Sequence, residues 1–231
     1  MNKVEFDRFA DAYDDQHRQN IALTGEGPEY FAEYKIKKLR QAADRLKISA
    51  KHICDFGSGI GNSIPYFRQY FPEASLAAAD VSERSLAISQ ARFPGTERHL
   101  LIEDHHIAEP AGAFDVIFSA CVFHHISHEE HVTWLKELYR VTRSGGLIAV
   151  AEHNPLNPLT VRAVNTCPFD ENARLIGANR MTERLREASW SSPTIEYNLF
   201  FPRQLAWLRP LEPHLAWLPL GAQYMALARK P

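Results

Sequence analysis

A glycine-rich turn carries the clearest chemical signal in the sequence. Residues 53–62 read ICDFGSGIGN, so that Asp55 precedes the alternating glycines Gly57, Gly59 and Gly61. Glycine can adopt positive φ and lets the backbone approach a ligand closely. If a helix follows the turn, its first amides face the polar end of that ligand. The run therefore predicts a nucleoside-type cofactor site where a buried strand ends.

A second acidic residue supports this interpretation. Asp80 ends the apolar run 75–80, about 20 residues beyond the turn, where a carboxylate can accept hydrogen bonds from both ribose hydroxyls. The dinucleotide pattern G-x-G-x-x-G requires a third glycine at position 62, which is Asn62. The spacing thus argues against a nucleotide-dependent oxidoreductase, which stays an alternative.

The elements that position these residues follow from the hydrophobic pattern. A helix is expected over 28–46. After it, strand-like runs alternate with helix-like ones, which predicts a parallel sheet with helices on both faces. The expected strands are 52–56, 75–80, 98–103, 114–120 and 146–153, and the expected helices are 62–71, 82–93 and 128–142.

The later part of the chain has a different pattern. Strands are expected at 194–201 and 222–230, with no long helix between them, so they should form an antiparallel pair at the sheet edge. The prediction is an α/β, Rossmann-like fold with a seven-stranded, mostly parallel sheet. Gly145 and Gly146 are expected to stop the helix before the fifth strand, 154–160 to be a proline-rich turn, and 169–189 to hold two helices.

Length and composition limit the class of protein. The 231 residues fit one domain, with a helical cap over 1–49, a cofactor-binding core over 50–153, and a C-terminal part of the same domain over 154–231. The 26 basic and 28 acidic residues argue against nucleic-acid or membrane binding through bulk charge. The absence of a signal peptide or membrane span, and three cysteines without C-x-x-C spacing, predict a cytoplasmic protein.

These motifs resemble the class I S-adenosylmethionine-dependent methyltransferases, and most of all their small-molecule branch, similar to the methyltransferases of quinone biosynthesis. The resemblance implies S-adenosylmethionine as cofactor and S-adenosylhomocysteine as product. It further implies that Asp80 holds the ribose, that Val81 adjoins the adenine, and that Asp104, or its neighbour Glu103, reaches the adenine amino group. The methionyl part and the ribose would be held by the turn, through Asp55, Gly57, Ser58, Gly59 and Gly61. Tyr13 would lie near the cofactor's carboxylate, and Ser119 and Ala120 would pass the methionyl group.

Histidines are the candidates for acid–base chemistry. The cofactor is already a strong electrophile, so the protein mainly aligns the reactants and deprotonates a hydroxyl acceptor. His124 and His125 follow the fourth strand, and His153 ends the fifth. Each of them has an alternative reading as a packed, hydrogen-bonded residue. The spacing of His124, His128 and His131 also suits a metal, but a shared helix face is not assured, and no metal site is expected.

The acceptor is the least determined part of the prediction. We expect a small molecule methylated at oxygen, with a non-catalytic S-adenosylmethionine-binding protein as another alternative. Residues 119–122 read SACV, unlike the N/D-P-P-Y/F motif of base amino-group methylation, so nucleic acid is not expected. The apolar segment 204–220 could form a lid over the acceptor, or it could pack or form the surface of a homodimer.

Overall fold

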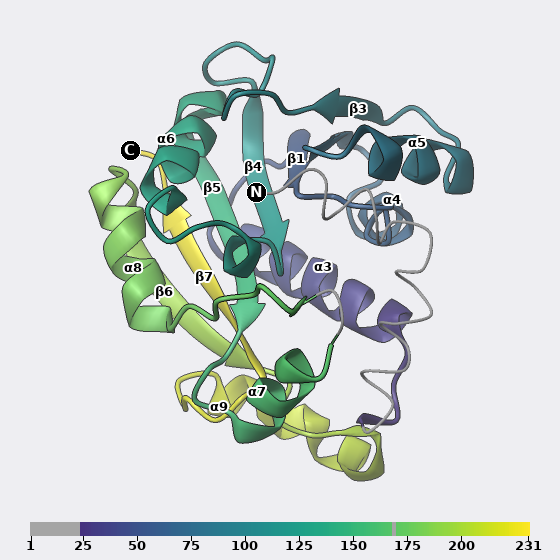
Figure 1. Cartoon of the computed structure of the whole chain (residues 1–231), viewed down its shortest axis with the longest axis vertical. Helices are drawn as coiled ribbons and strands as arrows, with labels where there is room; N and C mark the ends of the chain where they lie inside the picture. Colours follow the sequence, from purple (N-terminus) through teal and green to yellow (C-terminus); the bar gives the residue numbers. More distant parts are fainter. Residues whose placement is uncertain (1–23, 168–169) are drawn as a thin grey trace.

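The fold is a central sheet covered by helices on both faces (Figure 1). The computed structural model describes residues 24–167 and 170–231. The strands are β1 (His52–Phe56), β2 (Ser75–Asp80), β3 (Arg98–Leu101), β4 (Phe114–Ala120), β5 (Thr142–His153), β6 (Ser191–Asn198) and β7 (Gln223–Arg229). The α-helices are α3 (Pro28–Arg45), α4 (Ile64–Tyr70), α5 (Glu83–Arg92), α6 (His131–Val141), α7 (Pro158–Asn165), α8 (Ala178–Glu187) and α9 (Glu212–Leu215). Two 3₁₀ helices, η2 (Phe123–His125) and η4 (Arg203–Leu211), complete the described elements.

The sheet has seven strands in the order β3-β2-β1-β4-β5-β7-β6. Strands β1 to β5 pair in parallel, whereas β7 is antiparallel to both β5 and β6. The predicted mostly parallel α/β sheet with an antiparallel pair at its edge is confirmed. Strand β7 is inserted between β5 and the outermost strand β6, because the connection after β6 is long enough to return the chain to β5.

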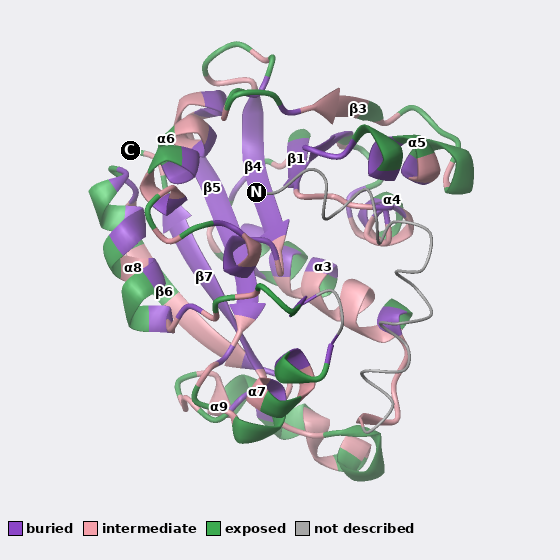
Figure 2. Ribbon diagram, viewed as in Figure 1, coloured by how far each residue is buried: buried purple, intermediate pink, exposed green. Residues whose placement is uncertain are grey.

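Two clusters of buried apolar side chains pack against the sheet, whose central strands are largely buried (Figure 2). Side chains alternate over 116–118, so that Val116 and Phe118 join α3 and α4 in one core, and Ile117 joins α6 and α8 in the other. Phe114 lies in the same core as Ile117, because the register shifts between Phe114 and Val116. Burial on both faces fits the continuous apolar runs seen in the sequence. No helix in the described ranges has the length and apolar character that crossing a membrane requires.

Three local expectations are wrong. Residues 154–160 are not only a turn, because Asn157 caps α7 by accepting hydrogen bonds from the amides of Leu159 and Thr160, and Pro158 takes the first helical position. Helix α6 ends at Val141, and Gly145, at φ 77°, lies inside β5. In the described part of 169–189, where two helices were expected, α8 is the one α-helix; Asp170 is in 3₁₀ conformation, and residues 171–177 are turn and irregular.

Candidate functional site

The glycine turn lies between the carboxyl ends of β1 and β2. Gly57, Gly59 and Gly61 all have positive φ, at 74°, 53° and 82°. The amides of Gly57 and Ser58 donate to the carbonyl of Ala79, and the amide of Gly59 donates to Asp80 Oδ2 at 2.8 Å. The second strand thus holds the turn through both its backbone and its terminal carboxylate.

The surroundings of Gly57 and Gly59 differ, which indicates a packing role for one glycine and a ligand-facing role for the other. A Cβ on Gly57 would lie 2.3 Å from Val122 Cγ2, so this glycine is required by the close loop after β4. A Cβ on Gly59 would meet no described atom within 4 Å. Gly59 is therefore the position at which the turn presents bare backbone to open space.

Three buried polar atoms beside this turn have no hydrogen-bond partner among the described residues. They are Asp55 Oδ2, Ser58 Oγ and Ser119 Oγ. Buried polar atoms are normally paired, so a cluster of unpaired ones indicates a polar ligand. The donor and acceptor chemistry fits the methionyl end of S-adenosylmethionine, which carries an ammonium and a carboxylate group.

The pKa of the buried Asp55 carboxyl lies well above its usual range. Burial, and then the charge of Asp80, raise the pKa of Asp55 to about 7, while the charge of Lys35 opposes the shift. A cationic ligand group at Asp55 would favour the ionised form. This carboxyl is thus poised to receive a positive charge.

The remaining predicted cofactor residues are distributed along the same edge of the sheet. Asp80 is buried, and its Oδ1 accepts from the Ser82 amide at 2.9 Å, which fixes the carboxylate. Val81 packs in the core beside it, and Ala120 is half-buried at the end of β4. Asp104 is exposed on the turn after β3, with φ 48°. Tyr13 lies outside the described residues.

His124 is held by a buried acid on the neighbouring strand. Glu152 Oε2 lies 2.6 Å from His124 Nδ1, and Glu152 Oε1 accepts from the amides of Val122 and Phe123. This one carboxylate therefore closes η2 and fixes the imidazole. Burial alone would lower the pKa of His124, but the charge of Glu152 and hydrogen bonds to Asp170 and Glu152 raise it to about 10.

Asp170 brings the second histidine to the same place. Asp170 Oδ1 lies 3.3 Å from His125 Nε2 and 3.6 Å from His124 Nε2. Burial and the charge of His124 lower the pKa of His125 to about 3, so His125 is neutral near pH 7. His128 and His131 take no part in this cluster, and His131 Nε2 instead lies within 3.0 Å of the Phe123 and Ile126 carbonyls.

His153 belongs to a further polar group around Cys121. Lys35 Nζ and Gln223 Nε2 lie 3.6 and 3.8 Å from Cys121 Sγ, and Gln223 Nε2 lies 3.5 Å from His153 Nδ1. The ring centroids of His153 and His124 are 5.2 Å apart. Burial would raise the pKa of Cys121, but Lys35 and His153 lower it to about 6. The carboxyl ends of β4 and β5 thus carry a cluster of polar and ionisable side chains, to which Lys35 contributes a positive charge beside Cys121.

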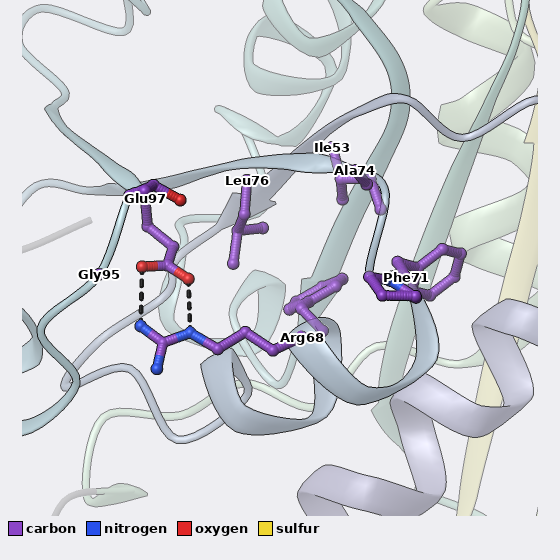
Figure 3. A pocket seen from close by; sticks show the side chains of 10 residues that line it. Ile53, Arg68, Phe71, Ala74, Leu76, Gly95 and Glu97 are labelled. Carbon is purple, nitrogen blue, oxygen red and sulfur yellow. Dashed lines mark hydrogen bonds and ion pairs between the residues drawn. The ribbon is translucent and has the colours of Figure 1, made fainter.

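Two other regions do not join this site. Trp207 and Trp217 in the segment 204–220 are 76% and 74% exposed, so in the described structure these rings do not line an enclosed pocket. A cavity of about 300 Å³ opens instead at the amino ends of β1 and β2, beside Ile53 and Leu76. Arg68 and Glu97 both line this cavity and are joined by a bidentate ion pair (Figure 3).

Sequence reasoning missed Lys35, Glu152, Asp170 and Gln223. Glu152 could have been found, because an acid inside the central apolar run LIAVAEH must be buried and needs a partner. Lys35, Asp170 and Gln223 lie far along the chain from the motif, and only the fold brings them near it.

Comparison with known proteins indicates a methyltransferase domain. The family model described as "Methyltransferase domain" matches residues 54–150. A trans-aconitate 2-methyltransferase of Azoarcus sp. is 29% identical over 69% of this chain and 62% of its own length. A demethylmenaquinone methyltransferase of Thermus thermophilus is 33% identical over 50% of this chain and 54% of its own. The chain therefore matches only about half to two thirds of these relatives.

Solved structures share the whole architecture. A S-adenosylmethionine-dependent methyltransferase of Thermotoga maritima, described as a possible histamine N-methyltransferase, aligns with a TM-score of 0.67. It covers 99% of each chain at 18% identity, which shows the common fold. Together with the sheet order and the glycine turn, these matches show a methyltransferase domain over residues 54–150, in a fold shared with S-adenosylmethionine-dependent methyltransferases.

Proposed function

We propose that this protein transfers a methyl group from S-adenosylmethionine to an oxygen atom of a small-molecule acceptor. The observation that carries the proposal is the glycine turn, where Gly59 faces open space and buried polar atoms of Asp55, Ser58 and Ser119 have no partner among the described residues. When bound, the cofactor supplies an electrophilic methyl group. The protein's task is then to hold both reactants in line and to exclude water, which can contribute roughly 7–11 kcal/mol.

Among the three candidate histidines, His153 is the proposed base. His124 is committed to Glu152 and Asp170, and its pKa near 10 keeps it protonated. His125, with a pKa near 3, is too weak a base for a hydroxyl. His153 is half-buried at the end of β5, and Gln223 orients its ring. It can accept the acceptor's proton at a ring nitrogen, whereas a carboxylate acceptor would need no base.

The acceptor is proposed to be anionic. Lys35 forms no ion pair with a described carboxylate within 4.0 Å and instead faces Cys121, beside His153. The relative named for trans-aconitate, a small tricarboxylic acid, supports this choice. The relative named for demethylmenaquinone supports a quinol as the second candidate.

The test offers both acceptor types. The protein would be incubated with S-adenosylmethionine and either trans-aconitate or a reduced naphthoquinone, and the products identified by mass spectrometry. We expect S-adenosylhomocysteine and an O-methylated product. With a hydroxyl acceptor, His153→Gln should lower kcat by about 100-fold or more and leave S-adenosylhomocysteine affinity unchanged.

The matched control is His128→Gln, which removes a histidine outside the cluster. Equal losses in both variants would contradict a role for His153. A carbon-methylated product would overturn the oxygen assignment. Tight cofactor binding with no turnover of any acceptor offered would instead favour the non-catalytic alternative.

A further inference from the structure

The cluster at the carboxyl ends of β4 and β5 contains more ligating groups than proton transfer requires. The ligand atoms of His124, His125 and Asp170 all lie within 4.8 Å of one another. Their side chains are only 1%, 10% and 6% exposed. Buried imidazole and carboxylate groups that converge in this way are the usual ligands of divalent transition metals.

We propose that His124, His125 and Asp170 form a binding site for a divalent transition-metal ion of the zinc type, with Glu152 orienting His124. This inference goes beyond the proposed methyl transfer, and the site itself does not depend on it.

The distances fit such an ion. Zinc–nitrogen and zinc–oxygen bonds of about 2.0–2.2 Å in a tetrahedral site place neighbouring ligand atoms about 3.3 Å apart. Asp170 Oδ1 lies 3.3 and 3.6 Å from the two imidazole nitrogens. A separation of up to 4.8 Å would have to close by up to about 1.5 Å, so binding is expected in the micromolar range or tighter rather than at the limit of structural zinc sites.

Glu152 supplies the supporting contact that metal-binding histidines characteristically have. Its Oε2 lies 2.6 Å from His124 Nδ1, so when Nδ1 donates to it, Nε2 presents its lone pair toward Asp170. Such a carboxylate–histidine pair fixes the tautomer and the ring orientation of a metal ligand. The amides of Val122 and Phe123 hold Glu152 in turn.

The charge of the cluster favours a dication. Glu152 and Asp170 are two carboxylates, and one proton on His124 balances only one of them. A divalent ion in place of that proton balances both. Lys35 contacts Cys121 rather than these acids, and the His153 ring lies 5.2 Å from that of His124.

The choice of ion follows from the ligands. Imidazole selects zinc, cobalt or nickel over magnesium and calcium, which prefer oxygen. Three protein ligands are also the number found in catalytic zinc sites, where the fourth position takes water or a substrate oxygen. At the acceptor side of the cofactor site, that position would receive an oxygen of the anionic acceptor proposed above.

The test uses the tag-free, full chain after EDTA treatment and dialysis, without cofactor. Zinc chloride would be titrated by calorimetry, and cobalt chloride by visible absorption. We expect one ion per chain and visible cobalt bands. His125→Ala and Asp170→Asn should each weaken zinc binding at least tenfold, and His128→Ala, which removes a nearby non-ligand histidine, should bind as the wild type does.

Folding of the variants is checked separately by S-adenosylhomocysteine binding, which also keeps this test distinct from the proposed function. If a variant fails to fold, zinc-edge X-ray absorption of the wild type decides, with two imidazole ligands expected. No binding by the wild type, equal binding by all three variants, or a sulfur-only or oxygen-only shell would overturn the proposal.

Discussion

At the scale of single residues, Asp55 should make cofactor binding depend on pH. Its pKa is raised to about 7 in the free protein, so below pH 7 the carboxyl carries a proton. The cofactor's ammonium group favours the ionised form, and binding at low pH must expel that proton. By calorimetry, S-adenosylhomocysteine should bind about tenfold more weakly at pH 6 than at pH 8.

The same raised pKa makes the stability of the free protein change with pH in the opposite direction to cofactor binding. A carboxyl with a raised folded pKa stabilises the free protein while it is protonated, and this contribution is lost as the pH rises toward 7. Asp55→Asn should flatten both the binding and the stability profile. Equal wild-type affinities at pH 6 and pH 8 would show that Asp55 does not face the cofactor's charge.

Residue-level prediction from the sequence had a clear limit. That Asp55, Asp80 and the glycines meet at one turn could be predicted because a local motif fixes their surroundings, and their contacts with the cofactor stay predictions. The position of Asp170 beside His124 and His125 could not be predicted, because these histidines precede it by some 45 residues and only the packing of the fold brings them together. The roles of Tyr13, Val81 and Asp104 stay predictions.

At the scale of elements, the glycine turn offers a matched pair of substitutions. Gly59→Ala adds a methyl group to open space at φ 53°, so we expect a strain of about 1 kcal/mol and a folded protein. The same methyl group would occupy the space assigned to the cofactor. S-adenosylhomocysteine affinity should therefore fall at least tenfold, measured by calorimetry, with only a small change in melting temperature.

Gly57→Ala should instead act mainly on stability, with a large fall in melting temperature. Its Cβ would lie 2.3 Å from Val122, and we expect unfolding to be easier by about 2–4 kcal/mol from overpacking and positive φ together. Thermal denaturation of both variants checks the pair. A Gly59→Ala protein that binds as tightly as the wild type would mean that the open face is not the cofactor's.

Element boundaries were less predictable than element types. The alternation of strands and helices was visible because buried parallel strands are short apolar runs. Helix α7 was missed because two prolines suggested a turn, although proline is well placed at a helix start and Asn157 supplies the cap. Gly145 and Gly146 suggested a helix stop, yet pairing of Thr142 with Phe114 draws the chain into β5 before the glycines.

At the scale of the whole molecule, the sheet order explains where the chemistry is. The polar residues of the site come from the carboxyl ends of β1, β2, β4 and β5. These strands are parallel neighbours in the sheet, so their carboxyl ends lie side by side. Antiparallel β7 adds Gln223 at its first residue, opposite His153 at the last residue of β5. An antiparallel strand starts where its parallel neighbours end, so its amino end reaches the site.

The most direct test of this account is calorimetric titration of the full chain with S-adenosylmethionine and, separately, with NADH. Asp80→Ala removes the proposed ribose contact, and Asp44→Ala, at an exposed position on α3, is the matched control. We predict micromolar binding of S-adenosylmethionine alone, retained in Asp44→Ala and lost in Asp80→Ala. No binding of S-adenosylmethionine, or a preference for NADH, would contradict the assignment of the glycine turn to this cofactor.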